Sequence, residues 1–359
     1  MRLTGSYSCS LEATGRRDES SSGLLVTQHA GCWRAHSSQI IRLRSTVSMR
    51  FCSAPVVGLL LVQCCLPLVH AWGRIGHEMV GNLAWRLLSN ETQSLVEAYL
   101  MHEAGDCPDC SPLGKIADWA DSARRTHEYH WSGPLHYIDI HDGSIRGGCP
   151  ATNDTTTESD CHFVYDRDCV EDVCVVGAVK NYTQRLSIDP TESLKFLTHF
   201  VGDLHQPLHV GRDSDRGGNE QHVHYHATYR GTRGLQRHGS NLHSVWDDGI
   251  IETWMGKSNR SMLEGMLWDR IQHAIQTGDY DTWTWCGLEC ISSWAEESLQ
   301  LALHWAYRNY DGSEVVDGST LTSDYYRTRL PIVQEQLAVA GARLASLLEK
   351  HMSSVLLAQ

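Results

Sequence analysis

Apolar residues recur at intervals of three to four along much of the chain, which is the pattern of amphipathic helices. From Gly76 onward, Val80, Leu83, Ala84 and Leu87 keep this spacing, so a helix is predicted there. Similar periodicity predicts further helices over residues 193–204, 246–255, 294–307 and 331–357. Strand-like alternation is scarce, and its best example covers residues 221–229. The pattern therefore predicts a mainly helical protein with a single domain.

One long apolar run near the N-terminus interrupts this pattern. Residues 55–69 form an apolar stretch of 15 residues, and a membrane helix needs about 20. A short basic start at Met49-Arg50 precedes the run, and Val69 and Ala71 supply the small residues that a signal peptidase accepts. We therefore predict a signal peptide with cleavage after Ala71.

This cleavage defines the expected organisation of the chain. The signal peptide covers residues 49–71, and residues 72–359 form the mature domain, without a membrane span. Residues 1–48 are either an atypical leader or sequence upstream of the true start. The mature protein is expected to be a monomer that is secreted or held in the endomembrane lumen.

Charge and cysteine content agree with an extracellular or lumenal enzyme. Removal of residues 1–71 leaves 23 Lys and Arg against 40 Asp and Glu, so broad phosphate neutralisation by the protein surface is excluded. Eight cysteines remain, an even number that predicts disulfides. Local pairs are possible for Cys169 with Cys174 and for Cys286 with Cys290. The pairing of four others stays open: Cys107, Cys110, Cys149 and Cys161. Four sequons predict glycosylation at Asn90, Asn153, Asn181 and Asn259.

Histidines and aspartates recur together at helical spacing. His199 and Asp203 are four residues apart and share a helix face, and His243 and Asp247 repeat this spacing. Pro207 is predicted to end the first helix and to bring His209 near by. Neutral imidazole and carboxylate oxygen both suit zinc. Ordinary hydrogen bonding explains any single histidine, but two such pairs favour a multi-metal site, with Asp121 and His136 as further candidates.

Six segments then occur in the order found in one known family. They read WGRIGH, IADWAD, PLHYID, THFVGDLHQPLH, GGN and NLHSVWD. In this the chain resembles the zinc-dependent single-strand-specific nucleases typified by mung bean nuclease, the class I nucleases. The resemblance implies a disulfide-stabilised, all-α domain of the zinc phospholipase C/nuclease type that holds three zinc ions.

The resemblance also implies which residues bind the metals. One zinc ion takes Asp121, His136, His199 and Asp203. A second takes His209, His243 and Asp247. The third takes His77, Asp203 and the main-chain amine and carbonyl of Trp72, so that Asp203 bridges two ions.

The remaining site residues follow from the same resemblance. Asp121 orients the water that attacks phosphorus, and Arg124, otherwise read as an exposed surface arginine, stabilises the transition state. Tyr137 stacks on a base, for which core packing is the alternative. Three residues match positions that hydrogen-bond the base edge: Asp139, Gly217 and Asn219.

Two segments depart from the family pattern near these motifs. Residues 147–160 form an insertion rich in Gly and Thr, and residues 229–239 form a basic segment. Arg230, Arg233 and Arg237 in the basic segment are expected to guide the phosphate backbone.

The sequence therefore predicts a zinc-dependent endonuclease that hydrolyses single-stranded DNA and RNA to products with a 5'-phosphate, and that also acts on 3'-nucleotides. A zinc-dependent phospholipase C and a catalytically silent zinc-binding glycoprotein are the alternatives. Phospholipases tend to carry Glu at the position of Asp247, and the GGN segment with Tyr137 resembles a base pocket, which favours the nuclease.

Overall fold

The protein is described by a computed structural model that covers residues 72–103, 105, 107–141, 161–228, 236–285 and 287–356. These described residues all belong to one compact unit. Several predictions lie outside the described residues: those for residues 1–71, residues 147–160, Asn153, Cys149, Cys286, Arg230, Arg233 and the side chain of Arg237.

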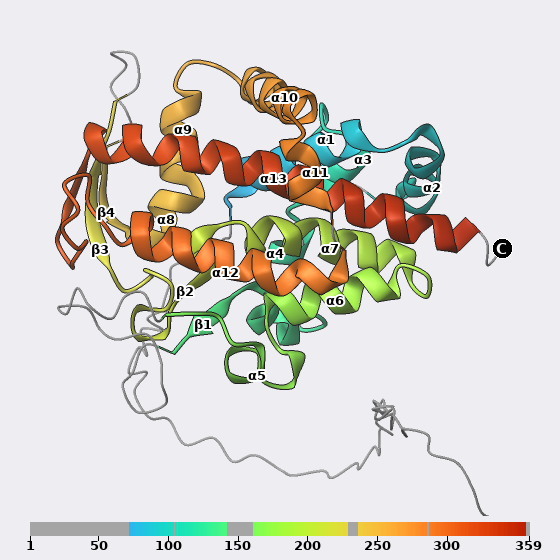
Figure 1. The fold of residues 1–359 in the computed structure, drawn as a ribbon, viewed down its shortest axis with the longest axis horizontal. Helices are drawn as coiled ribbons and strands as arrows, with labels where there is room; N and C mark the ends of the chain where they lie inside the picture. The colour runs from blue at the N-terminus through green and yellow to red at the C-terminus, as the bar shows by residue number, and fades with distance from the viewer. Residues whose placement is uncertain are drawn as a thin grey trace, which may run out of the picture. The chain divides into compact units, whose positions relative to one another are not determined.

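The described residues are mostly helical, as predicted (Figure 1). The α-helices are α1 (Arg74–Leu87), α2 (Asn90–Leu100), α3 (Pro112–Ile116), α4 (Trp119–Ala123), α5 (Tyr165–Asp168), α6 (Val175–Arg185), α7 (Pro190–Leu204), α8 (Leu242–Ser244), α9 (Ile250–Met255), α10 (Arg260–Thr277), α11 (Asp279–Thr284), α12 (Ile291–Leu301) and α13 (Ser323–Leu356). Short 3-10 turns are η1 (His130–His136), η3 (Val170–Asp172), η4 (Pro207–His209), η5 (Asp213–Asp215) and η7 (Leu288–Cys290), and π-helical turns are η6 (Val245–Gly249) and η8 (Ala302–Ala306).

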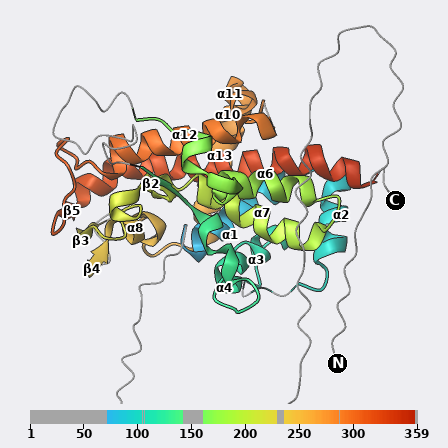
Figure 2. The ribbon, with the colours of Figure 1, turned by 90° about the horizontal axis from the view of Figure 1, so that it is seen from below.

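The central helix is α7, which is covered on all sides by other elements. Every residue from Phe196 to Leu204 is buried, and a helix buried all round lies in the core of its domain. α13 contacts both α1 and α7, and α4 contacts α7 from another side. In Figure 2, α13, α7 and α4 follow one another from the upper to the lower part of the view. Residues on α7 are therefore held by packing from several directions.

Two small sheets complete the fold and match the scarcity of strand patterns. β1 (Ile138–Ile140) pairs in parallel with β2 (Val210–Arg212). β3 (His222–His226) pairs with β4 (Gln236–Asn241) in antiparallel and with β5 (Thr320–Thr322) in parallel. β3 confirms the strand predicted over residues 221–229. β2 follows directly after His209, and β1 begins two residues after His136, so the first sheet brings these two histidines to the same place.

Three predicted helices differ in detail from the structure. Residues 246–255 are divided between η6 and α9, and residues 294–307 between α12 and η8. α13 begins at Ser323, so Pro331 lies inside a helix that was predicted to start there. Proline removes one helical hydrogen bond, and the packing of α13 along α1 maintains the helix across it. α7 ends at Leu204, and Pro207 opens η4 rather than ending α7 itself.

Two disulfides join buried cysteines that lie close together in the sequence. Cys169 and Cys174 are bonded, as predicted, and Cys107 bonds Cys110. Cys161 is disulfide-bonded as well, as is Cys290.

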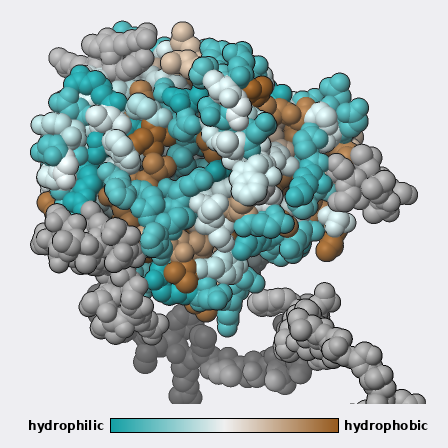
Figure 3. Space-filling view, in the orientation of Figure 1, coloured by the Kyte–Doolittle hydropathy of each residue, from teal (hydrophilic) through white to brown (hydrophobic). Residues whose placement is uncertain are grey.

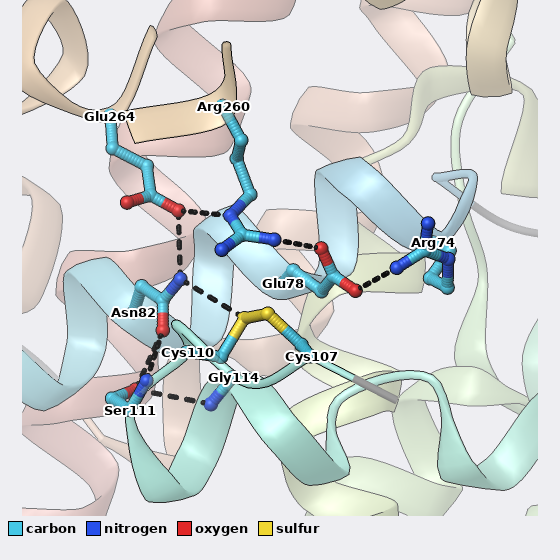
Figure 4. The surroundings of a disulfide bond; sticks show 9 residues. All are labelled: Arg74, Glu78, Asn82, Cys107, Cys110, Ser111, Gly114, Arg260 and Glu264. Carbon is cyan, nitrogen blue, oxygen red and sulfur yellow. Dashed lines mark hydrogen bonds and ion pairs between the residues drawn. A yellow bond between two sulfur atoms is a disulfide. The ribbon is translucent and has the colours of Figure 1, made fainter. Parts of the chain in front are cut away.

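A polar cluster surrounds the Cys107–Cys110 disulfide (Figure 4). Asn82 on α1 accepts hydrogen bonds from the amide and hydroxyl of Ser111, and it donates one to Glu264 on α10 at 2.7 Å. α1 is thereby fastened to both α3 and α10.

The surface is largely polar on the face drawn in Figure 3, where apolar residues lie scattered between hydrophilic ones. No helix among the described residues has the length and apolar character that a membrane crossing requires.

Candidate metal centre

α7 and α1 build the first part of the site around one carboxylate. His199 and Asp203 lie four residues apart on α7, and both are fully buried, as predicted. His77 of α1 stacks on His199 with ring centroids 3.9 Å apart. This approach requires Gly202, because a Cβ there would lie 2.6 Å from His77 Nδ1.

Asp203 contacts three imidazoles at once. Its Oδ1 lies 3.2 Å from His77 Nε2 and 3.3 Å from His199 Nε2. Its Oδ2 lies 2.9 Å from His136 Nδ1. A single carboxylate therefore joins α1, α7 and the end of η1.

Asp121 of α4 closes this cluster. Asp121 Oδ1 lies 3.7 Å from both His136 Nδ1 and His199 Nε2. Arg124, one turn later, pairs with the same oxygen at 2.8 Å, and 15% of the arginine side chain is exposed. Arg124 is thus partly buried and attached to the site, rather than a surface arginine. We call the following five residues the Asp203 group: His77, Asp121, His136, His199 and Asp203.

A second cluster lies where η4 meets the start of α8. His209 Nε2 is 3.1 Å from His243 Nε2, and His243 Nε2 is 3.5 Å from Asp247 Oδ2. We call these three residues the Asp247 group. Asp247 sits on the π-helical turn η6, so the regular α-helix expected from the four-residue spacing is absent. The side chains of His243 and Asp247 nevertheless lie next to each other.

Gln206 supports the Asp247 group from within the core. It is fully buried, and its Nε2 donates to Asp247 Oδ1 at 2.6 Å. Its Oε1 accepts from the amide of Leu208, the residue before His209, at 2.6 Å. Gln206 was not singled out from the sequence, because nothing in the THFVGDLHQPLH segment indicates its contact with Asp247.

Backbone carbonyls fix the orientation of three imidazoles. His199 Nδ1 donates to Ala117 O at 2.7 Å and His209 Nδ1 to His136 O at 2.6 Å. His243 Nδ1 donates to Gly217 O at 2.7 Å. Because Nδ1 carries the proton in each case, Nε2 presents its lone pair to the clusters, which is how metal-binding histidines are held.

Electrostatics in the two groups favours a bound cation. Burial raises the pKa of Asp203 well above its ordinary value, and the Asp121 carboxylate adds to the rise. Burial also raises the pKa of Asp247, helped by Asp248. Burial lowers the pKa of His136, as does the nearby His199. Buried carboxylates beside neutral imidazoles lack a compensating charge, and a metal ion supplies it.

The donor set and spacing fit zinc. Zinc bonds of about 2.0–2.1 Å in tetrahedral geometry place neighbouring donor atoms about 3.3 Å apart. The donor pairs here lie between 2.9 and 3.7 Å apart. Asp121 Oδ2 is buried and has no hydrogen-bond partner, which a metal or its bound water would satisfy. Within the described residues, three groups able to hold a metal come from these side chains.

A fourth arrangement of donor residues has a different role. Glu78 lies near Cys107 and Cys110, but the two sulfurs are bonded to each other. Both Glu78 oxygens are paired with guanidinium groups, those of Arg74 and Arg260 (Figure 4). This cluster is structural in the disulfide-bonded protein.

Trp72 lies beside the Asp247 group. The indole is fully buried, and the next residue, Gly73, donates its amide to the carbonyl of Asp247 at 2.9 Å. A Cβ at Gly73 would collide with the Asp248 carboxylate. The first residue of the predicted mature chain is therefore packed at the site.

The predicted base-binding residues gather around β1 and the loop after η5. Tyr137 is half-buried, and Asp139 is exposed on β1, where it pairs with Gly211. Partial desolvation and the neighbouring Asp213 raise the pKa of Asp139 to about 6, whereas Arg216 opposes the rise. Sequence reasoning did not single out Arg216.

Gly217 and Asn219 occupy this loop in different ways. Gly217 has φ of 63°, and a Cβ would lie 2.3 Å from Leu208 O, so glycine is needed there. Gly217 donates its amide to Arg212 O at 2.9 Å, and its carbonyl accepts from His243 Nδ1. Asn219 is partly exposed and donates to Arg216 O at 2.8 Å.

Comparison with known proteins adds an independent finding. A family model described as S1/P1 Nuclease matches residues 72–353. Endonuclease 2 of Arabidopsis thaliana is 35% identical over 306 residues, which cover 79% of this chain and 91% of that protein. Endonuclease 1 of the same plant is 33% identical over 315 residues, covering 82% and 91%. Nuclease S1 of Aspergillus oryzae is 31% identical over 300 residues, covering 79% and 92%.

Proposed function

Because the chain belongs to the S1/P1 nuclease family, and is therefore a nuclease acting on phosphodiester bonds, we propose that it is a zinc-dependent endonuclease of single-stranded DNA and RNA. Its products carry a 5'-phosphate, and it also removes phosphate from 3'-nucleotides. The observation that carries this proposal is the pair of buried His/Asp clusters at metal-coordination spacing.

Nine residues are proposed to hold three zinc ions. Four share one ion, three share the second, and Asp203 bridges to the third with His77 and Trp72. The residues are Trp72, His77, Asp121, His136, His199, Asp203, His209, His243 and Asp247. Bound zinc supplies Lewis acidity, lowers the pKa of water and offsets phosphate charge.

Asp121 and Arg124 then act on the reacting groups. Asp121 Oδ2, buried and without a protein partner, accepts a hydrogen bond from the attacking water and orients it toward phosphorus. Arg124 is partly exposed and held by Asp121 Oδ1, so its guanidinium reaches the phosphate oxygens and stabilises the charge that develops on them.

Selectivity for single strands follows from the residues beside the clusters. Tyr137 follows the candidate ligand His136 directly, and a base can stack on its half-buried ring only if it leaves a duplex. Asp139, Asn219 and the backbone of Gly217 would then hydrogen-bond the edge of that base. In support, Asp139 and Arg216 both act electrostatically on Tyr137, and Asn219 donates to the carbonyl of Arg216.

Processing of the chain completes the proposal. Cleavage after Ala71 would give Trp72 the free amine that would hold the third zinc ion together with His77 and Asp203, and a protein that keeps Ala71 would bind that ion weakly. The family model also begins at Trp72. We propose that the mature chain is a secreted or lumenal monomer with glycans at its four sequons, Asn90, Asn153, Asn181 and Asn259.

One experiment tests the proposed activity. The mature protein is incubated with single-stranded DNA, single-stranded RNA, duplex DNA and phosphatidylcholine. We expect 5'-mononucleotides from the single strands, loss of activity on chelation and recovery with zinc. Hydrolysis of the lipid alone would select a phospholipase C, and absence of all hydrolysis would select a silent binding protein.

A matched pair of histidine variants links the activity to the site. His209→Ala removes a buried imidazole of the Asp247 group, whereas His304→Ala removes an exposed one on η8. We expect His209→Ala to lose zinc and activity and His304→Ala to keep both. Equal activity in the two variants would contradict the assignment of the site.

A further inference from the structure

An exposed tryptophan lies on the element that carries a candidate metal ligand. Trp131 is the second residue of η1, which ends at His136, and 55% of its surface is exposed. A 3-10 helix rises about 2 Å per residue, so about 12 Å of this element separates Trp131 from Tyr137. Tryptophan is usually covered in folded proteins, and exposed aromatic rings are enriched where a ligand or partner binds.

Buried rings support Trp131 from below and connect it to the metal centre. Its ring centroid lies 6.1 Å from that of Phe196 on α7. Phe196 is stacked 5.2 Å from Phe200, and Phe200 lies 5.0 Å from His136. Both phenylalanines are fully buried. The exposed indole therefore rests on a rigid base that continues to a candidate ligand.

Trp131 contacts α7 at Phe196, which lies away from the metal-binding end of this helix and hence from the reacting phosphate. Phe196 and Asp203 are seven residues apart on α7, which corresponds to about 10 Å along the helix. This spans up to about three nucleotides at the 3.4 Å rise of a stacked strand. A ring at Trp131 can therefore reach a base two or three nucleotides from the cut, beyond the nucleotide that stacks on Tyr137.

The surroundings of Trp131 carry charges of both signs, because Glu192, Glu128 and Asp189 act on Tyr129, whose ring centroid lies 6.4 Å from that of Trp131. Residues 124–131 contain Arg124, Arg125, His127 and His130 against one acidic residue, Glu128. Arg125, His127 and His130 are all exposed. Aromatic rings beside basic side chains such as Arg125 are found on surfaces that bind single-stranded nucleic acid, and base stacking itself needs no net positive charge.

We propose that Trp131 is a second stacking platform, which binds a nucleobase two or three nucleotides away from the phosphate being cut. This inference rests on the proposed function, because it assumes a single-stranded substrate. The platform adds affinity for strands longer than a dinucleotide, and it is indifferent to base identity because every base has an aromatic face.

The test compares substrates of two lengths. Trp131→Ala, Trp131→Phe and Trp285→Ala are measured with the dinucleotide and the octanucleotide of thymidine. Trp285 is the matched control, because it is exposed and far along the chain, on the segment after α11. For Trp131→Ala we expect the ratio of kcat/KM for the octanucleotide to that for the dinucleotide to fall about tenfold, through KM.

The variants distinguish stacking from a structural defect. Trp131→Phe keeps an aromatic face, so we expect it to restore most of the ratio, and Trp285→Ala to leave the ratio unchanged. An unchanged ratio in Trp131→Ala, or equal losses in the Phe and Ala variants, would overturn the subsite while the nuclease activity stands. A wild-type protein inactive on both substrates would instead overturn the proposed function itself.

Discussion

The two halves of the metal centre are held in different ways. In the Asp203 group, one carboxylate contacts His77, His136 and His199, and the helices that carry these residues pack against each other in the core. In the Asp247 group, Asp247 contacts one histidine and is fastened by the amide of Gln206. The first half is organised by a shared ligand, and the second by supporting hydrogen bonds.

This difference determines how many metal-binding positions a single substitution affects. Loss of a shared carboxylate affects every donor that it contacts, because the negative charge holds them together. Loss of a carboxylate in the other half affects one position, because His209 and His243 keep their own backbone hydrogen bonds. The centre should therefore have one coupled half and one separable half.

Asp203→Asn should give the largest effect. We expect it to remove two of three zinc ions and to lower kcat/KM about a thousandfold or more, because the bridging charge is lost. Asp247→Asn should remove one ion. Metal content by mass spectrometry and kcat/KM on single-stranded DNA measure both variants, with the exposed Asp166→Asn as the control. Equal metal losses in the two variants would remove the distinction between the halves.

Gly202→Ala should damage the coupled half without removing any ligand. The new Cβ would lie 2.6 Å from His77 Nδ1, so the imidazole must move, and a displacement of about 1 Å can cost about a hundredfold in rate. Gly265→Ala is the matched control, since open space surrounds that position on α10. A Gly202→Ala protein with normal zinc content and normal kcat would show that His77 tolerates displacement.

Gln206→Ala should damage the separable half alone. The amide that orients Asp247 is lost, and such supporting residues typically contribute about 10- to 100-fold in metal affinity. We expect one ion to be lost at low zinc concentration and activity to recover when zinc is added. Gln336→Ala removes another buried glutamine, on α13, and should leave zinc binding intact. Loss of all ions from Gln206→Ala would mean that both halves are coupled.

Acid pH should give the smallest effect, a rise in KM that depends on Asp139 of β1 rather than on the metal ligands. The pKa of Asp139 is raised to about 6, so its carboxylate is present above pH 6 and is lost as the pH falls through 6. With zinc in excess, KM at pH 5 should exceed KM at pH 7 about tenfold, because about a tenth of the carboxylate remains. Asp139→Asn should abolish this dependence of KM on pH. A wild-type KM that is flat from pH 5 to 7 would exclude Asp139 from substrate binding.

Residue spacing predicted the main features of the fold and of the candidate site. The four-residue spacing of His199 and Asp203 indicated a shared helix face, and both side chains point into one cluster. His243 and Asp247 meet as well, although on a π-helical turn. The motif order indicated the nuclease family, which the family model confirms.

Other features depend on contacts that no local pattern encodes. Gln206 reaches Asp247 across 41 residues, and the need for Gly202 arises from an imidazole on another helix. The 3-10 and π-helical turns, η4 and η6, keep the same apolar spacing as an α-helix over one turn, so periodicity cannot separate them. The start of α13 was predicted at Pro331 and was wrong, because tertiary packing outweighs the one helical hydrogen bond that a proline removes.

The carbonyl groups that hold His199, His209 and His243 also affect how this enzyme can change over evolution. Every residue type has a main-chain oxygen, so no single substitution at Ala117, His136 or Gly217 deletes these acceptors. Imidazole orientation is thus protected against drift in the neighbouring side chains, provided that the backbone keeps its path. The histidine geometry can therefore persist while side chains around it change, except at Gly202 and Gly217, where a Cβ would not fit.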